Sequence, residues 1–321
     1  MPALTETQLE EFNREGFLVV QDIYDKERDF GPILAEYSEL LDSLCDRWYS
    51  EGKLPSRFDG LPFGEKFTEV VAADLPVYQH FDITLPQADL KPDTPMHTSA
   101  AVFNLLTNPN LLDAVESIVG PEILSSPIQH TRVKVPEHRL PDHIKHNNLV
   151  GTTCWHQDQG VGLPEIDNTN MLSVWFPLDD TDVENGCLKV VPRSNHQGLI
   201  THCPAPGKLE IPPQFIDDDA VVPVIMKGGS VMLFTRTTMH ASYDNNTERL
   251  RWSFDLRYQP IGQPTGRPMF PDFVARSRSN PASELRDAEV WADMWMQARA
   301  KVAAANPPVF NRWNSDHPLC A

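Results

Sequence analysis

The sequence predicts a mainly β protein with flanking helices, in which antiparallel strands form a sandwich or a barrel. Between about residues 122 and 260, short runs rich in Val, Ile, Phe, Trp and Leu are separated by Gly, Asn, Asp and Pro, as in "MLSVWFPL", "SVMLF" and "RWSFDLRYQ". Helices do not alternate with these runs, which disfavours a parallel, doubly wound sheet. We therefore expect one domain over residues 1–321: a mostly helical part to about 120, a strand-rich core over about 121–260, and an extension with a helix over about 261–321.

Helical spacing of apolar residues outside this core predicts helices over residues 5–16, 31–49, 108–123 and 283–305. The first helix is expected to begin at Thr5, because Thr5 and Gln8 have the spacing of a capping box, and to end at Gly16. Trp291 and Trp295 lie four residues apart and share one face of the last helix, which we expect to pack against the body of the protein.

Glycine-containing segments within the strand-rich region predict turns. "KGGS" (227–230) lies between two apolar runs and is predicted to be a tight hairpin. "DVENGC" (182–187) is predicted to turn at its Asn-Gly pair.

The composition excludes several classes of function. The chain has 45 acidic and 27 basic residues and a net charge of −18, which argues against a nucleic-acid surface. We expect no membrane binding either, because the chain has no apolar run of eighteen residues and no lysine-rich amphipathic stretch. The five cysteines are scattered and form no CxxC pair, which is typical of reduced thiols, and the N-terminus does not look like a secretory signal. These features predict a cytoplasmic protein with free thiols.

The segment "CWHQDQG" (154–160) carries the first candidate metal ligands, His156 and Asp158. In a strand, residues i and i+2 point to the same side, so these two side chains would face one space and Gln157 would point away or sideways. A third candidate, His240, follows the apolar run 231–234. Two imidazoles and one carboxylate suit a mononuclear iron(II) and leave coordination positions open for a co-substrate and dioxygen.

A candidate carboxylate-binding pair lies on the next predicted strand. Arg251 and Ser253 are two residues apart and so share one face of that strand. The planar guanidinium of Arg251 matches a carboxylate, and the hydroxyl of Ser253 would add a hydrogen bond to the same group.

Four elements in this order resemble the phytanoyl-CoA dioxygenase (PhyH) family of iron(II)- and 2-oxoglutarate-dependent oxygenases. They are "WHQD" (155–158), "VWFPLDDTDVENGCLKVVPRSNHQG" (174–198), "KGGSVMLFTRTTMHAS" (227–242) and Arg251, eleven residues after His240. The resemblance covers about residues 120–260 and is weaker in "LEEFNREGFLVV". It implies a double-stranded β-helix, which is a cupin-like jelly roll with the metal at its mouth.

The resemblance also implies roles for individual residues and a reaction. It implies that iron(II) is bound by His156, Asp158 and His240, that the distal carboxylate of 2-oxoglutarate is held by Arg251 beside Ser253, and that Gln157 and Trp175 approach this co-substrate. The implied reaction consumes O2, oxidises an unactivated C–H bond of a small-molecule metabolite or natural-product intermediate, and releases succinate and CO2.

The substrate contacts are less constrained by the sequence. "QHTRVKV" alternates, so either Gln129, Thr131 and Val133 or His130, Arg132 and Lys134 face inward. The resemblance favours Gln129 and Thr131 near the substrate and leaves Arg132 or Lys134 as neighbours of the co-substrate. Trp155 is a further residue that could line the pocket.

Two other functions use the same residues. A zinc hydrolase could bind its metal through His156, Asp158 and His240, although it would have no use for the carboxylate clamp and the chain has no HExxH motif. A non-catalytic binding domain could keep the barrel without the reaction. His143 and His146 are alternative zinc ligands, and Arg257 is expected to lie on the surface of its strand.

Overall fold

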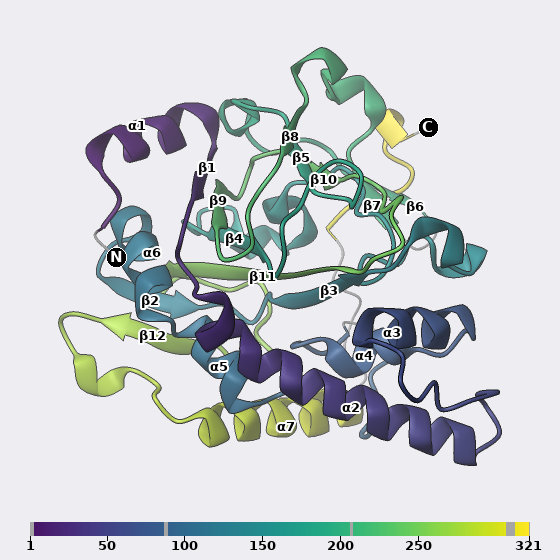
Figure 1. Cartoon of the computed structure of the whole chain (residues 1–321). Helices are drawn as coiled ribbons and strands as arrows, with labels where there is room; N and C mark the ends of the chain where they lie inside the picture. The colour runs from purple at the N-terminus through teal and green to yellow at the C-terminus, as the bar shows by residue number, and fades with distance from the viewer. Residues whose placement is uncertain (1–2, 87–88, 206–207, 306–311, 321) are drawn as a thin grey trace.

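The computed structural model describes residues 3–86, 89–205, 208–305 and 312–320, and it contains two facing antiparallel sheets (Figure 1). The larger sheet has the strand order β1-β9-β4-β11-β2-β12, and β3 also pairs with β11. Its strands are β1 (Phe17–Val20), β2 (Glu122–Ser125), β3 (His130–Lys134), β4 (Leu172–Pro177), β9 (Val231–Thr235), β11 (Arg251–Pro260) and β12 (Phe273–Ser277). The smaller sheet has the order β10 (His240–Ser242), β5 (Leu188–Val190) and β8 (Val222–Val224), while β6 (Cys203–Ala205) pairs with β7 (Lys208–Glu210).

Helices cover one side of the larger sheet, and the smaller sheet lies on its other side (Figure 1). The α-helices are α1 (Glu6–Glu15), α2 (Gly31–Ser50), α3 (Phe63–Ala72), α4 (Val77–Phe81), α5 (Ala100–Leu106), α6 (Pro109–Val119) and α7 (Ala288–Ala305). This arrangement of two sheets and a helical cover confirms the predicted mainly β fold with flanking helices and a jelly-roll core.

The central strand β11 separates the hydrophobic core from the polar interior. Its alternate residues Trp252, Phe254, Leu256 and Tyr258 are buried in the main hydrophobic core together with residues of the helices. Burying one such large side chain contributes about 1.5–3 kcal/mol, so this side of the strand is strongly fixed. Because side chains alternate along a strand, the polar residues between them point to the other side, toward the smaller sheet.

The predicted helix ends are largely confirmed. At α1 the Thr5 hydroxyl accepts a hydrogen bond from the backbone N–H of Gln8, while the Gln8 side chain accepts one from the backbone N–H of Thr5. Gly16 ends this helix with φ of 83°, which glycine adopts without steric cost. Helix α7 begins at Ala288 rather than at residue 283, and Trp291 and Trp295 are buried, as expected.

Two local predictions were wrong or incomplete. The segment 227–230 does not form a hairpin, because β8 before it pairs with β5 in the smaller sheet and β9 after it pairs with β1 and β4 in the larger one. The segment therefore connects the smaller sheet to the larger one. A glycine-rich turn between two apolar runs has the same sequence pattern whether it joins paired strands or two different sheets. The region after residue 260 also supplies β12, an edge strand of the larger sheet, in addition to a helix.

The prediction that all the thiols are free was wrong. Cys203 and Cys320 form a disulfide that joins β6 to the C-terminal segment, across a sequence separation of 117 residues. Cys45, Cys154 and Cys187 are free. Scattered spacing could not reveal this pair, because the two cysteines meet only in the folded chain.

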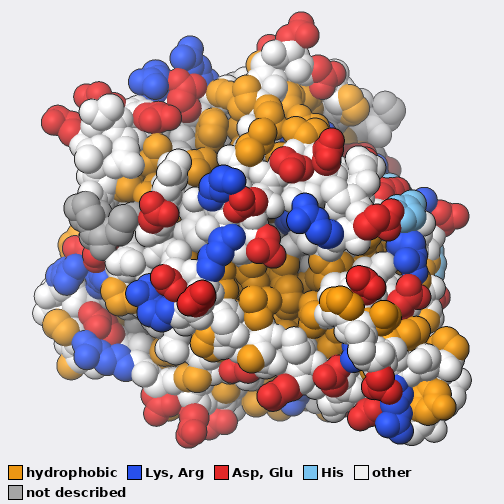
Figure 2. Space-filling view, in the orientation of Figure 1, with side chains coloured by type: hydrophobic (Ala, Val, Ile, Leu, Met, Phe, Trp, Pro, Cys, Tyr) orange, Lys and Arg blue, Asp and Glu red, His pale blue; other side chains and the backbone are white. Residues whose placement is uncertain are grey.

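The surface is acidic without a single acidic patch on the face in view. Figure 2 shows acidic side chains distributed over this face and mixed with lysines and arginines. No helix among the described residues is both long enough and apolar enough to cross a membrane.

Candidate metal centre and active-site cavities

Three candidate metal ligands meet between the two sheets. His240 begins β10, and His156 lies beside it, because the two residues exchange backbone hydrogen bonds of 3.0 Å. Asp158 opens a short 3-10 turn (Asp158–Val161) instead of continuing a strand, so the strand geometry predicted for it does not apply. The Nε2 atoms of His156 and His240 nevertheless lie 3.7 and 4.0 Å from Oδ1 of Asp158.

These three side chains form the one group of potential metal ligands with suitable geometry in the described part of the chain. One ligand atom of each lies within 4.8 Å of the others, and all three residues are buried. Within the described ranges, neither His143 nor His146 belongs to a group of this kind. Two histidines and one carboxylate can hold a divalent ion on one side and leave the opposite coordination positions open.

Both imidazoles are oriented by backbone carbonyls. Nδ1 of His156 lies 2.8 Å from the carbonyl oxygen of Cys154, and Nδ1 of His240 lies 3.0 Å from that of Thr238. A carbonyl only accepts, so each Nδ1–H donates and each Nε2 keeps its lone pair for a metal. Burial lowers the pKa of both histidines, which favours the neutral form that binds metal ions.

Asp158 is held by a buried arginine. Arg257 donates from Nη2 to Oδ1 at 2.6 Å and from Nε to Oδ2 at 3.1 Å, and the Ser173 hydroxyl also donates to Oδ2. Burial alone would raise the pKa of Asp158, but Arg257 and the two histidines lower it below its usual range. Asp158 is therefore ionised, which is the form that can bind a metal ion.

Arg251 has the environment expected of an anion-binding residue. It is 2% exposed, and its Nη1 donates to the Ser253 hydroxyl at 2.6 Å. Its Nε and Nη2 have no hydrogen-bond partner among the described residues, although an unsatisfied buried donor is costly. Burial, followed by repulsion from Arg132, lowers the pKa of Arg251 to about 9, so it is still charged at neutral pH.

A small inner cavity joins this arginine to two of the three candidate metal ligands. Its wall includes Arg251, His156 and His240, and the ring of Trp175 lies 5.5 Å from the Arg251 guanidinium carbon. The indole N–H of Trp175 also has no partner in the described part of the chain. The unused donors around this cavity fit a dicarboxylate that would extend from the candidate metal ligands to Arg251. 2-Oxoglutarate is a dicarboxylate of this kind.

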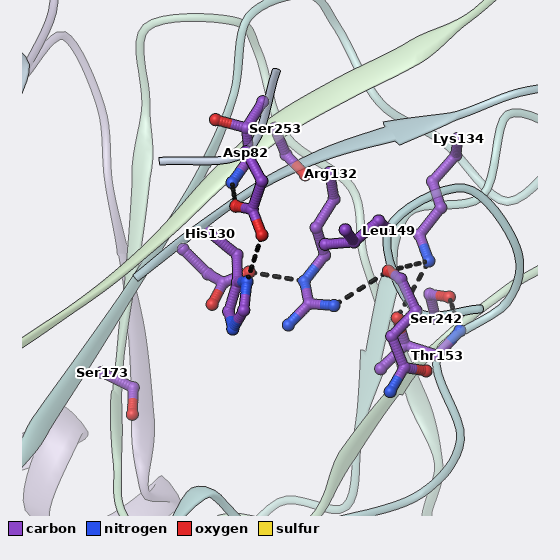
Figure 3. Close-up of polar contacts among 12 residues, drawn as sticks. Asp82, His130, Arg132, Lys134, Leu149, Thr153, Ser173, Ser242 and Ser253 are labelled. Carbon is purple, nitrogen blue, oxygen red and sulfur yellow. Dashed lines mark hydrogen bonds and ion pairs between the residues drawn. The ribbon is translucent and has the colours of Figure 1, made fainter. Parts of the chain in front are cut away.

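A larger cavity of about 590 Å³ adjoins His156 and Asp158. His130 and Arg132 of β3 line it, and Figure 3 shows both side chains on one side of the strand. The structure places Gln129 and Thr131, which were predicted near the substrate, on the opposite side. Gln129 donates to the carbonyl of Ile83, and the Thr131 hydroxyl lies 3.3 Å from that of Tyr37 in the helical layer.

Two further predicted contacts also lie elsewhere. The Gln157 amide donates to the carbonyls of Gly198 and Thr237 and accepts from the N–H of Ile200. These hydrogen bonds connect it to two neighbouring loops, and it lines neither cavity. Trp155 packs against the apolar cluster of Val191, Ile211 and Met239, and it also lines neither cavity.

Sequence reasoning missed the role of Arg257. It was assigned to the strand surface, yet its side chain is 4% exposed and also pairs with Asp255. A signal was present, since Arg251, Ser253, Asp255 and Arg257 follow a period of two along one strand. The pairing partner of Arg257, 99 residues away, could not be read from that pattern.

Comparisons with known proteins agree with this architecture. An L-proline trans-4-hydroxylase of Streptomyces griseoviridis is 24% identical over 146 residues, which cover 40% of this chain and 53% of that protein. The match thus spans about half the length of that relative. Among solved structures, the apo form of the non-heme monooxygenase ThoJ has a TM-score of 0.55 at 19% identity and covers 92% of this chain and 97% of its own. Its nickel complex has a TM-score of 0.50 at 17% identity and covers 93% and 99%.

The structural similarities support the shared fold. A sequence model of the phytanoyl-CoA dioxygenase (PhyH) family matches residues 12–253, which include all three candidate ligands and Arg251. This match extends over most of the chain and is not restricted to the metal-binding motif. The chain therefore belongs to the phytanoyl-CoA dioxygenase (PhyH) family.

Proposed function

We propose that this protein is an iron(II)- and 2-oxoglutarate-dependent dioxygenase that oxidises a C–H bond of a small molecule. The reaction would consume O2 and 2-oxoglutarate and release succinate and CO2. Hydroxylation is the simplest outcome, because one oxygen atom then enters the substrate. Family membership supports this class of reaction.

One observation carries the proposal. Three ligand atoms lie within 4.8 Å of one another, and beside them a buried arginine has two donor nitrogens with no partner in the described structure. A metal site alone would not need the arginine. The combination fits a metal that is chelated by an acid whose far carboxylate lies at Arg251.

Each residue then has a definite task. His156, Asp158 and His240 would hold iron(II), and Arg251 with Ser253 would bind the distal carboxylate of 2-oxoglutarate. Trp175 would lie along this co-substrate, and apolar side chains of the inner cavity, including Leu188 and Phe234, would exclude water. When bound, iron(II) and 2-oxoglutarate supply the oxidising power of the reaction, and the protein positions and shields the reacting groups.

The test is an anaerobic titration with iron(II) followed by 2-oxoglutarate. The wild type should develop the weak visible charge-transfer band of the chelate, and admission of O2 should yield succinate. Asp158→Ala should lose iron binding and the band. The absence of a band, together with hydrolytic activity of the zinc-loaded protein, would instead support a zinc hydrolase.

We further propose a small-molecule substrate and a cytoplasmic location. The larger cavity of about 590 Å³ has the size of a small-molecule site. The similarity to a hydroxylase of L-proline suggests a first substrate panel of small carboxylic acids, with and without an amino group, read out as substrate-dependent succinate formation. Fractionation of cells expressing the tagged protein tests the location, and recovery outside the cytosol, where the Cys203–Cys320 disulfide would persist, would overturn the cytoplasmic proposal.

A further inference from the structure

The larger cavity is lined by two side chains whose hydrogen-bonding capacity is only partly used. His130 and Arg132 are residues i and i+2 of β3, so both point to the same side of the strand. Their side chains are 27% and 13% exposed, respectively. The same cavity is lined by His156 and Asp158, so a molecule held by this pair would lie next to the metal site.

His130 is fixed from behind by Asp82. The Asp82 side chain is 4% exposed, and its Oδ1 accepts hydrogen bonds from the N–H groups of Ile83 and Thr131. Its Oδ2 lies 3.0 Å from Nδ1 of His130. An ionised carboxylate only accepts, so Nδ1–H of His130 donates to it. Nε2 is therefore the ring nitrogen left for a ligand.

Arg132 is fixed in a similar way by Asp255. Its Nε donates to Asp255 Oδ2 at 2.5 Å, and its Nη1 donates to the carbonyl of Asn148 at 2.8 Å. Its Nη2 has no hydrogen-bond partner among the described residues. In Figure 3 the outer nitrogen of His130 and a guanidinium nitrogen of Arg132 point to the same side, and no dashed line reaches either one.

The cavity offers no comparable partner for a cationic ligand. Among the described residues that line it, the carboxylates are Asp82 and Asp158. Asp82 is engaged by two backbone N–H groups and His130, while Asp158 faces the metal site and is bound by Arg257. An anionic ligand, in contrast, finds two nitrogens on β3 that the described residues leave available: Nε2 of His130 and Nη2 of Arg132.

Apolar side chains complete the cavity. Ile128 precedes β3, and Leu149, Val161 and Leu209 also line the wall. Such residues can bury a hydrocarbon skeleton, at about 25 cal/mol per Å² of apolar surface. A substrate that fits both features has an apolar body and one acidic end.

We propose that His130 and Arg132 bind a carboxylate of the substrate, and that the substrate class is small apolar carboxylic acids. In the complex, Nε2 of His130 and Nη2 of Arg132 would each share a hydrogen bond with one carboxylate oxygen, while Asp82 holds the opposite ring nitrogen of His130. This inference rests on the proposed function, because it assigns the substrate of the same iron site.

The test compares acids with their neutral amides. The anaerobic protein, saturated with iron(II) and 2-oxoglutarate, is titrated with hexanoate, cyclohexanecarboxylate and 4-phenylbutanoate and with the three corresponding primary amides. Binding is followed through the perturbation of the visible chelate band and by calorimetry. At least one acid should bind about tenfold or more tightly than its amide, as expected for hydrogen bonds to a charged group.

A variant pair assigns the effect to His130. His130→Asn retains a donor for Asp82 but removes the nitrogen that faces the cavity, so it should reduce the preference for the acid about tenfold or more. His138→Asn is the matched control, because His138 is 53% exposed and lies outside the cavity, and it should bind like the wild type.

The outcomes separate this inference from the proposed function. If the chelate band forms but the amides bind as well as the acids, or no acid binds, the carboxylate assignment is wrong and the oxygenase proposal stands. If His130→Asn keeps the full preference for acids, His130 is not the anchor. If no chelate band forms in the wild type, the proposed function itself fails.

Discussion

The buried pair between Arg257 and Asp158 predicts a large effect of one substitution. In Arg257→Met the carboxylate of Asp158 loses two hydrogen bonds from the guanidinium, and Asp255 loses one. The paired side chains are only 4% and 1% exposed, so water cannot replace the lost cation. Removing one partner of such a buried ion pair typically costs about 3–5 kcal/mol, and we expect a loss of this size in the free energy of unfolding.

The assay is urea unfolding of the metal-free protein in the presence of a chelator, so that the ion pair is tested without a bound metal. Arg257→Lys should lose less stability than Arg257→Met, because lysine retains the charge but cannot form both hydrogen bonds. Arg249→Met is the control, since Arg249 is exposed just before the same strand and should change stability by no more than about 0.5 kcal/mol. An Arg257→Met protein as stable as this control would refute the reasoning.

Three further predictions follow from the site and its surroundings. Arg251→Gln should raise the 2-oxoglutarate concentration needed for half-maximal succinate formation about ten- to a hundredfold, as the loss of charged hydrogen bonds implies; an unchanged requirement would contradict the co-substrate assignment. Burial lowers the pKa of His202 to about 4. The unfolded state therefore binds more protons at His202 below about pH 6.5, and this one residue should lower the unfolding free energy by about 2 kcal/mol between pH 7.5 and pH 5. In urea unfolding, the loss of stability over this range should be smaller in His202→Gln than in the wild type by about that amount, and an equal loss in both would contradict the prediction. Alkylation of the denatured, unreduced protein should modify three of the five cysteines, because Cys203 and Cys320 are paired; five modified thiols in mass spectrometry would exclude the disulfide.

Several features of the fold could be predicted because they depend on local sequence. The capping box at Thr5 and the glycine that ends the first helix act within a few residues, so their pattern is sufficient. The strands of the core are recognisable from their alternation and turn residues. The tight hairpin predicted at 227–230 failed because its glycines permit a sharp turn without deciding which strands pair on either side.

In the candidate site, too, some features could be predicted from local sequence and others could not. The ligand set of His156, Asp158 and His240 stands out in the sequence through motif order, although its metal-binding role is a proposal that the iron titration tests. The period of two along β3 shows that His130 and Arg132 share a face, but it does not say which face meets the cavity. That choice depends on the helices that cover the other face and bury Thr131.

The sequence by itself determined the mainly β fold and the residue types available for a metal and a dicarboxylate, because these follow from short-range patterns, and its similarity over residues 12–253 determined the family. Only the tertiary structure decided that Arg257 binds Asp158, that His130 and Arg132 face the larger cavity, and that Cys203 meets Cys320. Each of these contacts joins residues or surfaces that are distant along the chain. Their positions are set by the packing of two sheets and a helical layer against one another, and a periodic pattern within one strand carries no information about that packing.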